Sequence, residues 1–456
     1  MDMNKTLEYF KQISQIPRPS GSEKRIADFV ENFAKERNLF VRRDNNNNLI
    51  IKKNVSNSPL ILQAHLDMVC EKEDWVKKDM TKEGVDLVFD GNILKANGTT
   101  LGADDGMGVA IILSILDEDF SRNLECVFTT EEETSMGGAK SLDTSLLEGH
   151  NIIGLDGSEC GVLEVSSAGF VSIKIDTNKN RKKVENSDAK NLFSFHINGL
   201  VGGHSGEDIN KGRLNANILM SQILNNAQIV SINGGSKFNV IPTSCNCLAI
   251  LSQQEKQQVI NKFKIIKQQN IGVEKSAKLE CEKIEKLPTQ VNNFEDIIDF
   301  VNSVPSGVIY SEGDFVITSL NVAKINTDLN EIWLSLRSSK KEQEECVIQQ
   351  IKTLCDKFNY QMMIVDKSPF FEFKNNTKLL NILDSAYKKL YGTLPQKKRI
   401  HAGLEGGVFA QKIKDANIYV TAPNMFDLHT TNERVEIDSI NKTYDWICEV
   451  VKDYNE

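Results

Sequence analysis

The chain has 456 residues, of which 40% are hydrophobic, and its 54 Lys and Arg against 63 Asp and Glu give a formal net charge of −9. This length is ample for a buried core and too long for one comfortable domain, so we expect two domains. A net negative chain without a strongly basic stretch excludes nucleic acid and anionic membranes as expected partners. No signal-peptide pattern opens the sequence and no apolar run approaches about 20 residues, which predicts a cytoplasmic protein.

Two amphipathic segments come first. The spacing of their apolar residues predicts helices over 5–16 and 22–37. Ser20 or Ser22 can cap the second helix, because a short hydroxyl side chain accepts a backbone N–H at a helix start. Residues 71–90 are charged and have no period, so we expect an irregular insertion there.

A buried strand ends in a histidine and an aspartate. The apolar run 60–64 is followed directly by His65 and then by Asp67. Side chains two residues apart on a strand point the same way, so the imidazole and the carboxylate share a face. Such a pair can be a metal ligand with the acid that orients it. It can equally be a chance sequence at a strand end.

A glycine-rich loop carries two further acids. Asp104 and Asp105 lie among glycines, just before an apolar stripe of helical spacing over 109–116. The glycines let the backbone approach its neighbours closely. One carboxylate in this place is explained by a helix cap, which is the simpler interpretation of Asp105.

Two more strands end in acids. The β-rich residues 124–130 stop at Glu131, Glu132 and Glu133, and the apolar strand 151–155 stops at Asp156. By itself the glutamate run would be a solvated charge cluster, but crowded acids repel one another unless cations lie nearby. Ligands bind at the carboxyl edge of open α/β sheets. Three such strand ends and one acidic loop therefore predict a metal site.

The pattern changes in the middle of the chain and then returns. From about residue 171, strands and helices follow in an α+β order that suggests two similar halves, with a polar hairpin loop over 177–190. We predict that 1–170 and 371–456 form a discontinuous α/β domain with a central mixed, mostly parallel sheet flanked by helices. Residues 171–370 would then be an inserted α+β lid or dimerisation domain.

Several motifs together resemble those of a known family. They are H-L-D at 65–67, L-G-A-D-D-G at 101–106, T-E-E-E-T-S-M-G-G-A at 130–139, G-G-H-S-G at 202–206, H-A-G-L-E-G-G at 401–407 and a late His429. Their order and spacing resemble the aminoacyl-histidine (Xaa-His) dipeptidases of peptidase D type. These belong to the two-zinc dipeptidase, carboxypeptidase and aminoacylase metallopeptidases. Ser135 stands where that family usually has glycine.

The resemblance implies a ligand set for two divalent metal ions per chain. It assigns Asp104 as the carboxylate that bridges them. His65 and Asp156 would complete one site, and Glu133 and His429 would complete the other. The expected metal is zinc, with manganese or cobalt as alternatives.

Three catalytic residues follow from the same resemblance. Asp67 would orient His65. Glu132 would be the general base that takes a proton from the water bridging the metals, leaving hydroxide, and passes it to the leaving amine. His204 would stabilise the tetrahedral oxyanion across a homodimer, with a histidine packed in the core as the alternative.

Four positions resemble substrate contacts. Asn239 lies in F-N-V-I-P, and Arg337 in L-S-L-R-S can hold the carboxylate of a dipeptide through two parallel hydrogen bonds. A surface ion pair is the alternative for Arg337. Glu405 together with His401 would hold the amino end of the substrate.

The predicted function is metal-dependent hydrolysis of dipeptides with free N-termini, including Xaa-His, by a cytoplasmic enzyme. An N-acyl amino acid amidohydrolase or a tripeptide peptidase would use the same metal centre. A rival of another class is a catalytically silent dimeric binding protein, which we expect to have lost a ligand or the base; the sequence lacks neither.

Overall fold

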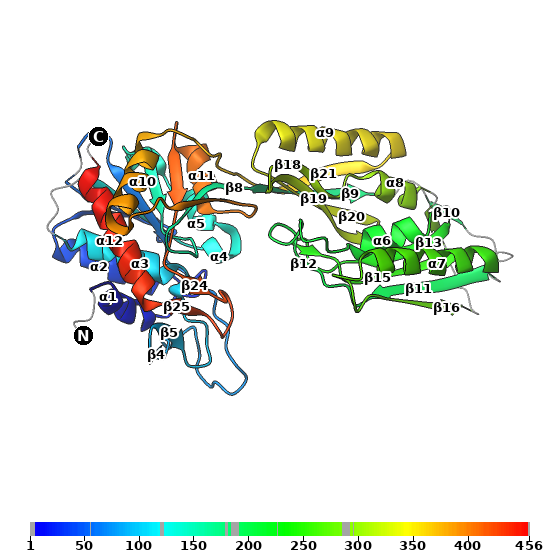
Figure 1. Cartoon of the computed structure of the whole chain (residues 1–456), viewed down its shortest axis with the longest axis horizontal. Helices are drawn as coiled ribbons and strands as arrows, with labels where there is room; N and C mark the ends of the chain where they lie inside the picture. Colours follow the sequence, from blue (N-terminus) through cyan, green and yellow to red (C-terminus); the bar gives the residue numbers. More distant parts are fainter. Residues whose placement is uncertain are drawn as a thin grey trace. The chain divides into compact units, whose positions relative to one another are not determined.

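The structure is a computed structural model that describes residues 5–54, 56–118, 123–177, 181–183, 191–225, 227–284, 292–294 and 296–454. Most of the loop predicted over 177–190 lies outside these residues. The chain divides into two compact units (Figure 1). The first unit comprises Met1–Ser167, Phe371–Ile400 and Leu404–Glu456, and the second comprises Ala168–Phe370 and His401–Gly403.

The first unit contains an eight-stranded sheet. Its strands are β1 (Phe40–Arg43), β2 (Leu49–Lys53), β3 (Leu60–His65), β6 (Leu124–Thr129), β7 (Asn151–Gly154), β8 (Val162–Ser167), β22 (Gln396–Ile400) and β23 (Asn417–Val420). They lie in the order β1-β2-β6-β3-β7-β23-β8-β22. Strand β3 is parallel to β6 and β7, β7 is parallel to β23, and β8 is parallel to β22. The predicted mixed, mostly parallel sheet is confirmed.

Helices cover both faces of this sheet, which is why every residue of β3 is buried. The helices are α1 (Lys5–Ser14), α2 (Lys24–Glu36), α3 (Ala103–Leu116), α4 (Glu132–Ser135), α5 (Gly137–Ser141), α10 (Lys378–Tyr391), α11 (Glu405–Lys412) and α12 (Ile437–Asp453), with a 3₁₀ turn over Thr144–Leu146. Leu60, Leu62 and Ala64 pack in the core that holds α1, α2, α3, α10 and α12. Ile61, between them, packs in the core of α5 and α11 on the other face. This alternation points His65 to the same face as Ile61.

A second, four-stranded sheet in this unit holds the late histidine. It consists of β24 (Met425–Phe426), β25 (Arg434–Glu436), β5 (Ile93–Ala96) and β4 (Leu87–Asp90), in that order. His429 lies in the connection between β24 and β25. The expectation of an irregular segment over 71–90 is wrong at its end, because Leu87–Asp90 pairs with β5.

The second unit is built on a nine-stranded antiparallel sheet. Its order is β16-β11-β15-β13-β19-β20-β9-β21, and β18 also pairs with β19. The bounds are β9 (Gly169–Asp176), β11 (Leu192–Asn198), β13 (Gln228–Gly234), β15 (Cys245–Ile250), β16 (Lys278–Lys283), β18 (Gly307–Glu312), β19 (Phe315–Asn326), β20 (Glu331–Ser338) and β21 (Gln361–Ser368). Two short pairs are separate from this sheet: β10 (Arg181–Lys183) with β17 (Asn292–Phe294), and β12 (Gly203–His204) with β14 (Val240–Ile241).

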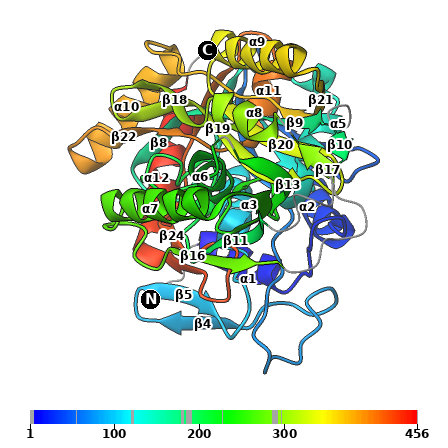
Figure 2. The ribbon, with the colours of Figure 1, turned by 90° about the vertical axis from the view of Figure 1, so that its right-hand side faces the viewer.

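Four helices pack on this sheet and share one apolar core with it. They are α6 (Ala216–Ile223), α7 (Gln253–Gln269), α8 (Ile297–Ser303) and α9 (Lys341–Phe358). All four helices are labelled in Figure 2. Among the helices that the structure describes, none combines the length and the apolarity needed to cross a lipid bilayer.

Candidate metal centre

The candidate ligands of the first unit lie at the carboxyl ends of neighbouring strands. His65 is the last residue of β3, Asp156 follows β7 by two residues, and Glu133 lies in α4 just after β6. Because β3 is parallel to both β6 and β7, these ends meet at one edge of the sheet. Asp104 is added by the start of α3 and His429 by the β24–β25 connection.

The carboxylate of Asp104 lies between two histidines. Its Oδ1 is 3.0 Å from His65 Nε2, and its Oδ2 is 3.2 Å from His429 Nε2. On the first side, Asp156 Oδ1 lies 3.7 Å from His65 Nε2. On the second side, Glu133 Oε2 lies 3.0 Å from His429 Nε2. The structure thus brings all five expected ligands together, two on each side of one carboxylate.

The acids of this cluster are crowded. Burial raises the pKa of Asp156 to about 7, and burial with the charges of Asp156 and other acids raises the pKa of Glu132 well above its ordinary value. Hydrogen bonds to Asp104 and Glu133 raise the pKa of His429 to about 11. Each shift has the direction expected where negative charge is in excess, and such a site attracts cations.

Donor atoms in the cluster suit a hard or borderline cation. One oxygen or nitrogen from each of His65, Asp104 and Glu133 lies within 4.8 Å of the others, and the same holds for His65, Asp105 and Asp156. Within the described part of the chain, the buried Glu133 Oε1 and His65 Nδ1 take no hydrogen bond. The imidazole and carboxylate donors present therefore fit zinc and related divalent ions.

The carboxylate of Asp105 accepts hydrogen bonds from two backbone N–H groups. Its Oδ2 accepts the N–H of His65 at 3.1 Å, and its Oδ1 accepts the N–H of Gly108 at 3.1 Å. Asp104 and Asp105 have non-helical backbone angles, so the regular part of α3 begins after them. The second bond satisfies a free donor in the first turn of this regular part, in agreement with the helix-cap interpretation. A Cβ at Gly108 would lie 2.2 Å from Asp105 Oδ1, so a larger residue there would displace this carboxylate.

Asp67 ties the acidic segment to the end of β3. Its oxygens accept the N–H groups of Glu132 and Glu133 at 3.1 and 3.2 Å, and Oδ1 lies 3.5 Å from His65 Nδ1. Burial opposes its charge, but the neighbouring His65 imidazole and the hydrogen bond from Ser20 hold the pKa of Asp67 at about 2. The expectation that Ser20 or Ser22 caps α2 is wrong. The N-cap residue is Glu23, and Ser20 Oγ donates to Asp67 Oδ2 at 2.7 Å.

Two buried residues beside the cluster were missed by sequence reasoning. Arg18, which is 1% exposed, donates to the carbonyl oxygens of Leu66, Asp67 and Gly102. Glu433, which is 2% exposed, accepts backbone N–H groups of the loop that carries Asp104. Both bind backbone atoms, so neither contact has a sequence spacing that could have revealed it. The one feature of the sequence that could have pointed to Arg18 and Glu433 is that each is a charged residue within or beside a motif.

Glu405 is buried on the α11 side of the sheet. Its Oε2 accepts hydrogen bonds from Gln63 Nε2 at 2.7 Å and from Thr129 Oγ1 at 2.6 Å. Burial raises the pKa of Glu405 to about 8, although the bond from Thr129 acts in the opposite direction. His401 belongs to the second unit, so a joint role of the two residues stays a prediction.

The other four candidate residues gather within the second unit. His204 Nε2 lies 3.3 Å from Arg337 Nη2, and His204 Nδ1 accepts the N–H of Glu207 at 3.3 Å. Asn239 directly precedes β14, which pairs with the strand of His204. His401 Nε2 is hydrogen-bonded to Ser319 Oγ at 2.7 Å, a partner that sequence reasoning did not find.

Arg337 is a buried cation. It is 7% exposed, its Nε takes no hydrogen bond within the described residues, and burial lowers its pKa to about 10. The alternative of a surface ion pair is therefore wrong. A buried guanidinium of this kind suits an anionic partner, and its two-pronged geometry suits a carboxylate.

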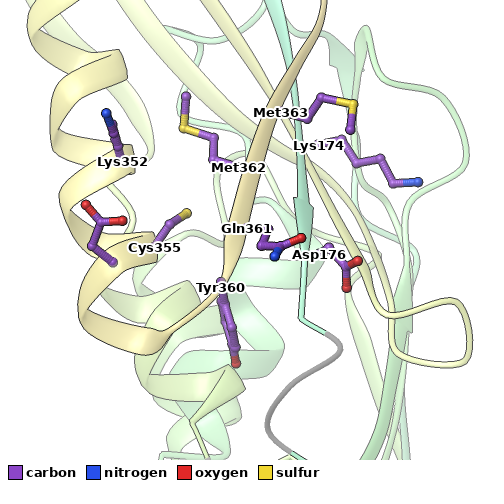
Figure 3. Close-up of a pocket in the computed structure, with 9 residues that line it drawn as sticks. Lys174, Asp176, Lys352, Cys355, Tyr360, Gln361, Met362 and Met363 are labelled. Atoms are coloured by element: carbon purple, nitrogen blue, oxygen red, sulfur yellow. The ribbon is translucent and has the colours of Figure 1, made fainter.

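A separate pocket of about 490 Å³ lies in the second unit (Figure 3). Lys352 and Cys355 reach it from α9, Gln361 and Met363 from β21, and Lys174 from β9. None of the candidate residues lines this pocket, and its lining includes no histidine.

His401, in the second unit, gives a prediction of how stability depends on pH. Burial, and then the positive charge of Arg337, lower the pKa of His401 to about 3, whereas an unfolded histidine titrates near 6.5. The unfolded chain therefore binds the extra proton as the pH falls below about 6.5, and stability is lost in that direction. Between pH 6.5 and 5.5 this group should cost about 1 kcal/mol of unfolding free energy. The loss, measured by urea denaturation, should be smaller by that amount in His401→Gln.

His196→Gln removes a histidine of β11 outside this group and is the matched control. It should keep the wild-type dependence on pH. Equal losses in wild type and His401→Gln would show that His401 titrates alike in the folded and unfolded chains.

Comparison with known proteins identifies the family of this chain. Residues 61–453 match the model of peptidase family M20/M25/M40. The chain is 29% identical to the cytosol non-specific dipeptidase of Escherichia coli (strain K12) over 470 residues, which span 98% of this chain and 96% of that protein. The crystal structure of aminoacylhistidine dipeptidase from Vibrio alginolyticus matches with a TM-score of 0.89 at 26% identity, covering 100% of this chain and 98% of its own.

A more distant structure shares the fold. A tripeptidase from Staphylococcus aureus matches with a TM-score of 0.57 at 16% identity, over 98% of this chain and 97% of its own. The family model alone spans most of the sequence, and the family resemblance expected from the motifs is confirmed. The chain belongs to peptidase family M20/M25/M40 and is therefore a peptide hydrolase.

Proposed function

We propose that this chain is a cytoplasmic, metal-dependent dipeptidase that cleaves dipeptides with free N-termini, Xaa-His among them. The observation that carries the proposal is the position of Asp104, whose two oxygens each face a different histidine. The names of the similar proteins support the substrate class, since one is a cytosol non-specific dipeptidase and another an aminoacylhistidine dipeptidase.

Five residues would hold two divalent cations, for which zinc is expected and manganese or cobalt are alternatives. Asp104 would bridge them, His65 and Asp156 would complete one site, and Glu133 and His429 the other. Such a pair would polarise the substrate carbonyl and lower the pKa of the attacking water. The three carboxylates fall one charge short of neutralising two divalent cations, which favours that ionisation.

Glu132 is the residue proposed to move the proton. It follows β6 beside Glu133, and its own N–H is fixed by Asp67. Its carboxylate takes the proton of the attacking water and passes it to the nitrogen of the leaving amino acid. Asp67 would hold His65 and the acidic segment in register, because it contacts both.

The second unit is proposed to bind the substrate carboxylate and the oxyanion. Arg337 is a buried guanidinium whose Nε takes no hydrogen bond among the described residues, which leaves it available to a substrate carboxylate. Asn239 would contact the substrate nearby. His204 would donate to the oxyanion from the partner subunit of a homodimer. His401 and Glu405 would hold the amino end.

The substrate class can be tested with matched peptides. Ala-His and Gly-Leu should be hydrolysed, whereas their N-acetylated forms and Ala-Ala-His should be cleaved far more slowly, by liquid chromatography of the products. Turnover of only the acetylated dipeptides would establish an amidohydrolase, and preference for the tripeptide would establish a tripeptidase. Metal-loaded protein that cleaves none of them would support a silent binding protein.

Replacing the proposed base should separate catalysis from metal binding. Glu132→Gln should keep the wild-type metal content, measured by elemental analysis, and lose roughly 10²–10⁴ in kcat, because the proton acceptor is gone. Glu131→Gln changes the exposed acid next to it and should keep most of the activity. Wild-type turnover in Glu132→Gln would mean that another residue accepts the proton.

Mixing two inactive variants tests the role of His204 across a dimer. Glu132→Gln and His204→Ala, unfolded and refolded together, should form some mixed dimers in which one site has both intact residues. Activity should then recover to a fraction of wild type, while each variant refolded alone stays inactive. Absence of any recovery, with mixed dimers detected by mass spectrometry, would place His204 in the same chain as its metal centre.

A further inference from the structure

The carboxylate of Glu433 accepts hydrogen bonds from the backbone of the loop that carries Asp104. Its Oε2 accepts the N–H groups of Leu101 and Gly102 at 2.8 and 3.0 Å. Its Oε1 accepts those of Ala103 and Asp104 at 2.8 and 3.4 Å. One carboxylate thereby satisfies four consecutive backbone donors, including that of the candidate bridging ligand.

The same glutamate belongs to the segment that carries His429. It lies four residues after this histidine, in the connection between β24 and β25, and its own N–H donates to the carbonyl of Thr430 at 3.1 Å. Its side chain therefore links the segment that carries His429, through hydrogen bonds, to the segment that carries Asp104, which is more than 300 residues away in sequence. The hydrogen bonds of its carboxylate run to the backbone, so it is placed to act through the ligands and not on the substrate.

We propose that Glu433 is a positioning residue that sets the separation of Asp104 and His429 and thereby the affinity of the metal centre. The inference rests on the proposed two-metal function. Asp104 can face both histidines only if the 101–104 loop and the β24–β25 connection keep their relative position. Partners outside the ligand shell that hold ligands in this way typically change metal affinity by 10–100-fold when they are replaced.

A cobalt titration tests this without relying on turnover. Metal-free wild type, Glu433→Gln and Glu433→Asp are titrated with Co²⁺ and followed by visible absorption, which reports both affinity and ligand geometry. Glu433→Gln keeps the shape but has one acceptor oxygen for four N–H groups, so its Kd should rise 10–100-fold with an altered spectrum. Glu433→Asp keeps both oxygens on a shorter stem and should lie between it and wild type. The Co²⁺ concentration for half-maximal activity should rise in parallel, while kcat at saturating Co²⁺ approaches that of wild type.

Glu436→Gln is the matched control. Glu436 lies three residues further along and accepts from the side chains of Asn92 and Asn424, away from the loop of Asp104. This variant should bind Co²⁺ as wild type does. Circular dichroism of the metal-free proteins checks that each is folded, and Glu433→Asp decides the question if Glu433→Gln does not fold.

Failure of the positioning role and failure of the metal centre would give different results. A Glu433→Gln protein that matches wild type in Co²⁺ affinity and spectrum, whatever its melting temperature, overturns the positioning role and leaves the dipeptidase proposal standing. A wild-type protein that binds no Co²⁺ overturns the metal centre itself, and the positioning role with it.

Discussion

The arrangement of the first unit depends on one carboxylate placed between two imidazoles. Asp104 offers one oxygen to His65 and the other to His429, and each histidine has a further acid beside it. Such crowding of acids is unfavourable in a buried place unless positive charge is near. Burial among these acids raises the pKa of Asp156, and hydrogen bonds to Asp104 and Glu133 raise the pKa of His429.

Strands and loops from distant parts of the chain meet at this carboxylate because the sheet is parallel at its centre. The ends of β3, β6 and β7 lie at one edge, where backbone donors and side chains are free to face a ligand. Around them, charged side chains bind backbone atoms of the ligand-bearing segments: Arg18 binds carbonyl groups, while Asp67 and Glu433 bind N–H groups. Rigid support of this kind keeps donor atoms in place before any ligand arrives.

The second unit has the opposite electrostatic character at its candidate residues. Arg337 is buried beside His204, and the pKa values of His204 and His401 are lowered, so both imidazoles are neutral near pH 7. A neutral histidine can donate one hydrogen bond without adding charge, and the guanidinium supplies the fixed positive charge. These are the properties that the proposed binding of a dipeptide carboxylate and an oxyanion requires.

The sequence by itself determined the strand-then-acid pattern, the α/β class and which histidines and acids deserved attention. Those features are local: an apolar run followed by His65, or a glycine loop around Asp104, is visible in a few consecutive residues. Only the tertiary structure decided that Ser20 binds Asp67 instead of capping α2, that Arg337 is buried, and that Ser319 meets His401. It also decided the contacts of Arg18 and Glu433, which reach backbone atoms of segments remote in sequence. A contact between a side chain and a distant backbone group leaves no periodic trace in the sequence, and it exists only once the chain has folded.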